Sequence, residues 1–501
     1  MAGVVAAGHP LTAEAGADVL REGGNAVDAA AAAVLASFAV ESPLTGFGAG
    51  GFMMVGRGEE TVLIDFFVAA PGKDGAERGA ELAAVPVHFD EETVQTFYVG
   101  PASCGVPGTA AGLELALRRF GTMAPGDLIG AGVRLAREGA PVNAEQAYIL
   151  EILWPIHERL TESRELYAPG GRPLGEGDLL RFPALADALE RFGAEGAEPF
   201  YRGEVAAALS SYVRERGGTL GPTDLAEYEA IERQPIHAPF RGAEVFTNPP
   251  PSSGGILIAY SLGLLERIGE RSGPEQLVAA IDAANHARDE EFAEALYGEE
   301  LARTLLDPQR LDLRAGDLLG STTHIAVLDA DGMCASVTCS NGSGSGVLVP
   351  GTGVILNNML GEEDLNPLGF HAIAPGRRVP SMMAPTVVRR DGEIELGLGS
   401  AGSNRIRSAI VQTVVRALEQ GMSAGEAVRA PRLHIEQGIV QAEPGIDEGA
   451  LARIEARGIP VLRRPRINLF FGGVQAVARD SSSGALSGGG DPRRGGSVAV
   501  A

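Results

Sequence analysis

A threonine precedes a strand-like segment, at a position from which its hydroxyl could act as a nucleophile. The run "STTH" at residues 321–324 leads through "THIAVLD" and a "DADG" turn into "MCASVTCS", a pattern typical of a β-hairpin. A threonine hydroxyl keeps its proton at neutral pH and needs a base within hydrogen-bonding distance. If the chain breaks before Thr322, the new α-amino group, with a pKa of about 7.7–8.0, can serve as that base.

No other base is indicated for this hydroxyl. The sequence has neither a GxSxG elbow in a suitable context nor a recognisable Ser-His-Asp arrangement. Alternation along the second strand of the hairpin places Thr338 and Ser340 on one face, from which the Ser340 hydroxyl could orient that of Thr322. The Ser-Thr-Thr run by itself is also compatible with an ordinary strand entry, because β-branched residues are common in strands.

The elements that must position Thr322 change character along the chain. Asn25 is expected to cap an alanine-rich helix that is apolar on nearly all sides and therefore buried. "GAGGFMMV" and "TVLIDFFV" are typical of paired strands. Further helical patterns cover residues 109–120, 125–137, 204–216, 255–268 and 274–297, whereas strand-like runs and one strong helix, "NRIRSAIVQTVVRALEQG", follow Thr322. This change fits either two domains or one layered α/β unit whose covering helices come from both parts.

The composition excludes several functional classes. The 501 residues are 45% hydrophobic, which allows a sizeable core, and the net charge of −24 argues against nucleic acid as a partner. Three widely spaced cysteines and scattered histidines predict neither a disulfide framework nor a metal site. The start has no basic, apolar leader, and the longest apolar run, residues 29–40, is too short to span a bilayer. We therefore expect a cytoplasmic protein without a membrane partner.

Motifs along the chain resemble the γ-glutamyltransferase (γ-glutamyl transpeptidase) family of amino-terminal-nucleophile (Ntn) hydrolases. The segment "STTHIAVLDADGMCASVT" is similar to the processing site of that family. Other stretches match in order: "GGNAVDAAAAAV", "GAGGFMM", "LIDF", "GVPGTAAGLELALRRFG", "NPPPSSGGI", "GTGVILNNML", "MMAPTVV", "GSAGSNRI" and "GDPR". The resemblance therefore spans nearly the whole chain, and it implies no cofactor.

The resemblance implies an α+β fold, a four-layer αββα sandwich built from both products of autocleavage between Ser321 and Thr322. Residues 1–321 would form the large subunit and residues 322–501 the small one, a heterodimer of two fragments that could itself dimerise. In cleavage, the Thr322 hydroxyl attacks the Ser321 carbonyl and water releases the resulting ester. In turnover, the acyl group of a small γ-glutamyl-type amide passes to Thr322 and then to water or an amine.

By the same resemblance, Thr322 is the nucleophile, and Thr323 and Ser340 support it. The backbone N–H groups of Gly402 and Ser403, within "GSAGSN", would form the oxyanion hole, because a glycine-rich backbone lets donors approach closely. Relatives usually have a second glycine where this chain has Ser403, a change that a backbone donor tolerates if the dihedral angles do. His324, which completes the motif, is expected to be a packed, hydrogen-bonded histidine.

Substrate contacts carry over to Asn341, Glu362 and Ser381, with Glu362 at the acidic position that holds the substrate amine. The segment "NNMLGEED" around Glu362 could equally be a solvated loop. The family's paired serines are altered here, because Met382 follows Ser381.

A second departure concerns the substrate carboxylate. Members that act on glutamyl groups have an arginine after "DF", where this chain has Phe67. A phenyl ring cannot replace a bidentate guanidinium group. Arg405 or Arg378 could substitute for it, with Arg405 our candidate among the substrate-binding residues.

The sequence thus predicts a glutathione hydrolase-like acyltransferase and leaves alternatives open. One is an acylase or amidohydrolase of the same family, acting on a cephalosporin-type or oxamate-type amide. Another is an unprocessed, non-catalytic binding protein. The string "GFGAGG" satisfies the dinucleotide-binding pattern, but a helix precedes it and a strand follows, the reverse of what that site requires.

We expect two bands on a denaturing gel of the purified protein, corresponding to residues 1–321 and 322–501. Thr322→Ala should give one band and no turnover, because the attacking hydroxyl is lost. A wild-type chain that stays intact after prolonged incubation would favour the binding protein. A Thr322→Ala chain that still splits at Ser321 would show that another group is the nucleophile.

Overall fold

The computed structural model describes residues 2–75, 82–88, 94–269, 271–288, 290–298, 300–306 and 322–501. Thr322 lies within these ranges, whereas Ser321, and with it the expected cleavage junction, lies outside them.

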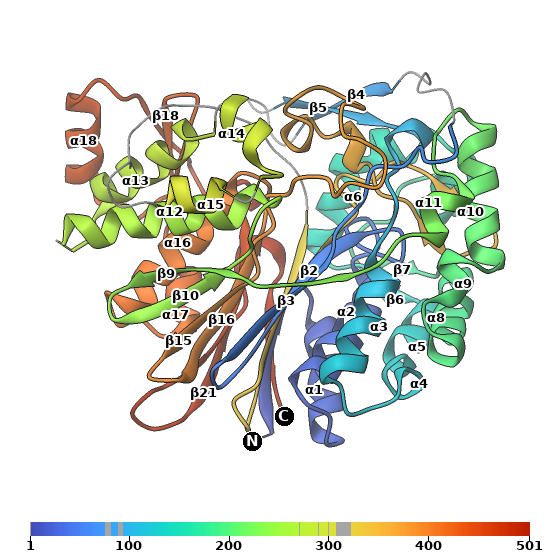
Figure 1. The fold of residues 1–501 in the computed structure, drawn as a ribbon, viewed down its shortest axis with the longest axis horizontal. Helices are drawn as coiled ribbons and strands as arrows, with labels where there is room; N and C mark the ends of the chain where they lie inside the picture. Colours follow the sequence, from blue (N-terminus) through green and yellow to red (C-terminus); the bar gives the residue numbers. More distant parts are fainter. Residues whose placement is uncertain are drawn as a thin grey trace.

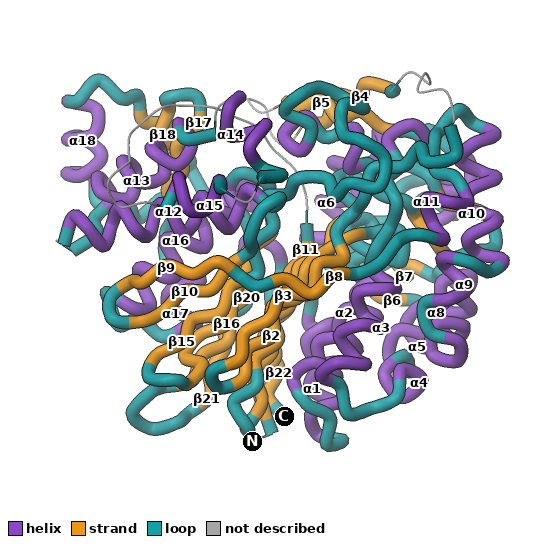
Figure 2. The backbone as a smooth tube through the Cα atoms, in the orientation of Figure 1, coloured by secondary structure: helices purple, strands orange, loops and turns teal. Residues whose placement is uncertain are grey.

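Two β-sheets built from antiparallel pairs lie at the centre of the molecule (Figures 1 and 2). The seven-stranded sheet has the order β22-β1-β11-β12-β2-β3-β8. Its strands are β1 (Gly3–Ala7), β2 (Gly50–Arg57), β3 (Glu60–Phe66), β8 (Ile231–Arg233), β11 (Thr323–Asp329), β12 (Cys334–Ser340) and β22 (Ser497–Val500). The six-stranded sheet has the order β21-β20-β16-β15-β10-β9. Its strands are β9 (Ile236–Phe240), β10 (Ala243–Thr247), β15 (Thr386–Arg390), β16 (Glu393–Ala401), β20 (Gly473–Arg479) and β21 (Leu486–Gly489).

Both sheets combine strands from before and after Thr322. In the first, β11 lies between β1 and β12, and β12 in turn pairs with β2. In the second, β10 pairs with β15. Strands β11 and β12 contact β16 across the space between the sheets, so the two sheets pack against each other. The chain is therefore one interleaved unit, not two independent domains.

Helices from the first part of the chain cover the seven-stranded sheet. They include α1 (Pro10–Arg21), α2 (Ala26–Val40) and α3 (Thr109–Phe120). Helix α2 contacts β11 and β12, and every one of its residues is buried, as the alanine-rich pattern predicts. Asn25 caps it through a reciprocal capping box with Asp28, which confirms the predicted start.

The six-stranded sheet is covered by α12 (Ser253–Ile268), which contacts β9 and β10, and by α16 (Arg405–Leu418), which contacts β16. Beside them lie α13 (Pro274–His286), α14 (Glu290–Ala295), α15 (Leu301–Leu305), α17 (Ala424–Arg429) and α18 (Glu448–Ala456). Figure 1 shows this group on one side of the sheets and the helices α1–α11 on the other. Within the described ranges, no helix is long and apolar enough to cross a membrane.

The remaining elements surround this centre. The helices are α4 (Pro125–Leu128), α5 (Gly130–Glu138), α6 (Ala144–His157), α7 (Thr161–Tyr167), α8 (Pro183–Glu195), α9 (Glu198–Tyr201), α10 (Glu204–Glu215) and α11 (Pro222–Ala226). The small sheets pair β4 (Ala83–His88) with β5 (Val94–Val99), β6 (Ala140–Pro141) with β7 (Leu179–Leu180), and β13 (Leu348–Val349) with β14 (Val354–Ile355). A three-stranded sheet joins β17 (Leu433–Glu436), β18 (Ile439–Ala442) and β19 (Val461–Arg463).

Two helix predictions were wrong in extent. The pattern over residues 274–297 forms two helices, α13 and α14, because Phe292 and Leu296 join a cluster with Ile256 and Tyr260 of α12. The pattern over residues 125–137 also divides, into α4 and α5, at Ile129, directly before Gly130, a residue type that weakens a helix interior. The predicted hairpin is confirmed, with β11 beginning at Thr323, so Thr322 directly precedes the strand.

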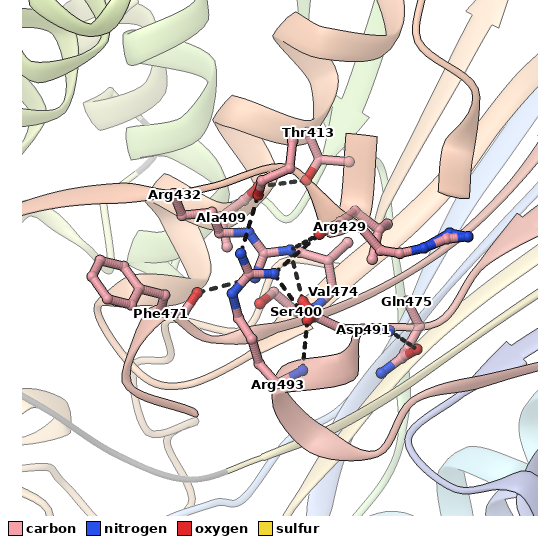
Figure 3. Close-up of polar contacts among 12 residues, drawn as sticks. Ser400, Ala409, Thr413, Arg429, Arg432, Phe471, Val474, Gln475, Asp491 and Arg493 are labelled. Atoms are coloured by element: carbon pink, nitrogen blue, oxygen red, sulfur yellow. Dashed lines mark hydrogen bonds and ion pairs between the residues drawn. The ribbon is translucent and has the colours of Figure 1, made fainter. Parts of the chain in front are cut away.

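A buried ionic cluster ties the end of the chain to the six-stranded sheet (Figure 3). Asp491 lies 2.7 Å from Arg432 and 3.1 Å from Arg493, and it accepts a backbone hydrogen bond from Val474 in β20. Burial alone would raise the pKa of Asp491, but the two guanidinium groups outweigh it, and the pKa is lowered overall. Arg493 also binds the buried Glu443. Asp491 and Arg493 belong to the "GDPR" motif, so this motif is structural.

We expect Asp491→Ala to lower the free energy of unfolding by about 3–5 kcal/mol, because it leaves two buried guanidinium groups without their shared carboxylate. Denaturant unfolding measures this change. Glu455→Gln, which breaks an exposed pair with Arg463, is the matched control and should have little effect. Equal stability of the two variants would contradict a structural role for the Asp491 cluster.

Candidate active site

Thr322 is held in the middle of the seven-stranded sheet, because β11 begins at the next residue and lies between β1 and β12. Its side chain is buried, and its Oγ1 donates a long hydrogen bond of 3.4 Å to Oγ of Ser340, the last residue of β12. That oxygen also accepts a 2.9 Å hydrogen bond from the backbone N–H of Gly342. The hairpin thus brings Thr322 and Ser340 together across its two strands.

Thr323 is anchored on the helical side of the sheet by a residue that sequence reasoning missed. Its hydroxyl donates a 2.6 Å hydrogen bond to Glu41, whose other carboxylate oxygen accepts one of 2.8 Å from Thr12. Glu41 ends the buried helix α2, and burial raises its pKa. A Cβ on residue 8 would lie 2.6 Å from Glu41 Oε2, so Gly8 makes room for this contact. The only signal in the sequence was an acid directly after a wholly apolar helix.

His324 is a packed histidine, as expected. Its Nδ1 lies 2.8 Å from the Thr338 hydroxyl, and Nε2 lies 3.4 Å from that of Ser336. Burial lowers its pKa to about 3, so the ring stays neutral at any pH near 7. His324 is therefore not poised to act as a base near neutrality.

The loop after β16 brings backbone groups toward the pocket that Thr322 lines. Gly402 and Ser403 have φ of +115° and +52°, and α16 begins at Arg405. Ser403 adopts the left-handed conformation that glycine takes more easily, so the substitution for glycine is tolerated. Its hydroxyl donates a 2.7 Å hydrogen bond to Asp364. Because this loop leads into α16, the positive end of the helix dipole lies beside it.

A pocket of about 30 Å³ joins Thr322 to this loop. Six of its lining residues are apolar: Phe67, Met359, Leu365, Met382, Met383 and Ile406. The others are Thr322, Ser340, Gly342, Glu362, Asp364, Ser381 and Ser403. No lysine or arginine is among these described residues. Larger cavities exist elsewhere, of about 400 and 360 Å³, but Thr322 lines neither of them.

Two carboxyl groups stand in the pocket wall. Glu362 and Asp364 are both buried, which excludes the solvated-loop interpretation at these positions. Burial raises the pKa of both, and for Glu362 the neighbouring Asp364 raises it further. Glu362 accepts a 2.8 Å hydrogen bond from the backbone N–H of Ser343. Asn341 is buried but does not line the pocket, and neither polar atom of its side-chain amide has a hydrogen-bond partner within the described part of the chain.

Of the remaining predicted residues, Ser381 lines the pocket, whereas Arg378 and Arg405 do not. The Ser381 hydroxyl accepts a 3.1 Å hydrogen bond from the backbone N–H of Met383. Arg378 lies 3.2 Å from Asp65 and over the ring of Tyr228. Arg405 donates a 3.1 Å hydrogen bond to the Phe470 carbonyl.

Neither of these two arginines, Arg378 or Arg405, lines the pocket. In its wall, at the position of the family arginine, Phe67 stacks on Phe52 with ring centroids 5.2 Å apart.

Comparison with known proteins gives this site its context. The family model described as gamma-glutamyltranspeptidase matches residues 12–501. A glutathione hydrolase proenzyme from Bacillus subtilis is 32% identical over 99% of this chain and 91% of its own length. The acylase ACY 1 proenzyme of a Pseudomonas strain is 33% identical over 95% of this chain and 89% of its own.

The fold is shared with solved structures as well. The crystal structure of a cephalosporin acylase from Bacillus halodurans superposes with a TM-score of 0.87, at 25% identity, and covers 100% of this chain and 96% of that one. The protein is thus an enzyme of the Ntn hydrolase class. It belongs to the γ-glutamyltranspeptidase family, whose members named above include both glutathione hydrolases and acylases.

We expect Gly402→Ala to lower both autocleavage and turnover by about 10²–10³-fold, the usual effect of losing an oxyanion donor. The new Cβ would lie 2.8 Å from the Gly472 Cα, so the loop must move. Gly421→Ala is the matched control, because Gly421 also has a positive φ but has open space around it. Gel densitometry and amide hydrolysis measure the two rates. Unchanged rates in Gly402→Ala would remove this loop from the mechanism.

Proposed function

We propose that the protein is an autoprocessing amidohydrolase with Thr322 as its nucleophile, and that its preferred acyl donors carry no carboxylate where glutamyl donors have one. Cleavage before Thr322 would yield residues 1–321 and 322–501, which remain together as one four-layer αββα unit. The interleaving of strands from both parts supports this, because neither part contains all the strands of either central sheet.

The chemistry follows from the groups around Thr322. The free α-amino group takes the hydroxyl proton as Oγ1 attacks the amide carbonyl carbon of the donor. The carbonyl oxygen gains negative charge and meets the N–H groups of Gly402 and Ser403, near the positive end of α16. The amine then gives its proton to the departing nitrogen, which leaves an ester on Thr322.

Water or an amine attacks this ester in the second half of the reaction. The α-amino group again takes the proton of the attacking group and returns it to Oγ1 as the ester bond breaks. Ser340 orients the hydroxyl, and the hydrogen bond of Thr323 to Glu41 fixes the strand. Substrate-side roles for Asn341, Glu362 and Ser381 are part of this proposal.

The observation that carries the donor preference is Phe67 in a pocket wall that has no cationic side chain among its described residues. A carboxylate placed there would lose its hydration without gaining a guanidinium partner. It would also face Glu362 and Asp364. The acylase relatives support this preference, and the glutathione hydrolase relatives make γ-glutamyl transfer the competing function.

A panel of p-nitroanilides tests the proposal. We expect kcat/KM for hexanoyl and phenylacetyl donors to exceed that for γ-glutamyl and glutaryl donors by at least ~10-fold, a difference of one charge-assisted contact. Phe67→Arg should shift the preference toward the carboxylate-bearing donors. Phe67→Leu, which keeps the wall apolar, is the matched control and should preserve the order.

Rapid turnover of the γ-glutamyl donor by the wild type would mean that another cation holds the carboxylate, and the donor preference would be wrong. Adding a dipeptide acceptor to each assay separates hydrolysis from transfer. Thr322→Ala provides the blank for every donor.

A further inference from the structure

Three arginines gather at the N-terminal end of α16, behind the loop that carries Gly402 and Ser403. Arg407, in the first turn of this helix, and Arg288, after α13, both lie 3.4 Å from the Asn404 side-chain oxygen. Arg405 lies 3.7 Å from Glu436, which in turn accepts a 3.4 Å hydrogen bond from the Asn404 amide. Asn404 is thus the centre of a cluster that draws on three separate segments of the chain.

Counted over the described residues, the cluster carries more positive than negative charge. Its carboxyl groups are Glu436 and Asp364, and burial raises the pKa of Asp364. The neighbouring His434 is neutral near pH 7, because burial lowers its pKa. Burial also lowers the pKa of Arg407, but only to about 9, so this side chain keeps its charge at neutral pH. The helix N-terminus adds further positive potential, which opposes cations at this end of α16.

Two donors of the cluster have no partner among the residues that the structure describes. Arg407 is 4% exposed, and neither its Nε nor its Nη1 has a hydrogen-bond partner within the described residues. The Nη1 of Arg405, also buried, makes no hydrogen bond but has an ion-pair partner, the Glu436 carboxylate 3.7 Å away. Buried guanidinium donors are nearly always satisfied, because an unmet charged donor costs more than a neutral one. A negatively charged acceptor would form hydrogen bonds with these donors and would also neutralise the excess positive charge.

The opposite end of the same helix shows how such an excess can be balanced without a ligand. Arg416, Arg432 and Arg493 surround two carboxylates, Asp491 and Glu443, so the formal count of charges is the same. There, however, Asp491 is paired at short range with Arg432 and Arg493 (Figure 3), and Glu443 is paired with Arg493. Arg416 lies in the last turn of α16, where the helix dipole favours a cation. Only one of its nitrogens, Nη1, is without a partner in the described structure.

We propose that the N-terminal end of α16 binds a small monovalent anion, such as chloride, between Arg407 and Arg288. Arg407 lines none of the cavities described above, which argues against a large ligand at this position. The anion would neutralise the charge behind Asn404 and so stabilise the turn that holds Ser403. This site is independent of the identity of the nucleophile and of the acyl donor.

Thermal unfolding of the full-length protein tests the proposal without any substrate. Sodium chloride and sodium bromide should raise Tm by at least about 2 °C over sodium gluconate at the same ionic strength and pH, with saturation as the site fills. Arg407→Met should abolish the difference between halide and gluconate. Arg416→Met, which removes a buried arginine from the other end of the same helix, should retain it.

A direct measurement covers the case in which Arg407→Met fails to fold. Bromide soaked into crystals of the wild-type protein should give an anomalous peak beside Arg407 and Arg288. Equal Tm values in halide and gluconate, a halide effect that survives in Arg407→Met, or the absence of a peak beside these side chains would each overturn the proposal.

Discussion

The position of Thr322 depends on the pairing of β11 between β1 and β12. This pairing fixes the backbone immediately after the nucleophile, and the contact of Thr323 with Glu41 holds the same strand from the helical side. All of these contacts are made by Thr323 and the residues that follow it in β11. A chain break before Thr322 would therefore leave the strand in place, which is what an amino-terminal nucleophile requires.

Buried charge is concentrated around α16 and the six-stranded sheet. The cluster of Asp491 anchors β20, next to β16, and the arginines near Asn404 surround the start of α16. The loop of Gly402 and Ser403 lies between β16 and this helix, so both of its ends are held. Such a loop can present backbone donors without reorganising during the reaction, which is the condition under which they stabilise charge best.

Specificity in this family is separate from the catalytic framework. The framework consists of strands, whereas the pocket wall comes from the ends of strands and from loops: Phe67 follows β3, and the segments 359–365 and 381–383 lie between β14 and β15. Relatives with the same fold carry names of different activities. A single replacement in the wall, such as a phenyl ring for a guanidinium group, can change the donor without disturbing the sheets.

The sequence alone determined the hairpin around Thr322 and the buried helix capped by Asn25, and the family resemblance pointed to five residues that line one pocket: Thr322, Ser340, Glu362, Ser381 and Ser403. These depend on local periodicity, capping and short motifs, which neighbouring residues specify. It did not reveal Glu41, Arg288 or Arg407, nor the division between α13 and α14. Glu41 and Thr323 are 282 residues apart, and Arg288 is 116 residues from Asn404, the residue of the α16 cluster that it contacts. Only tertiary packing decided these contacts, because burial creates the need for a partner and the fold, not the local sequence, determines which residue is near enough to supply it.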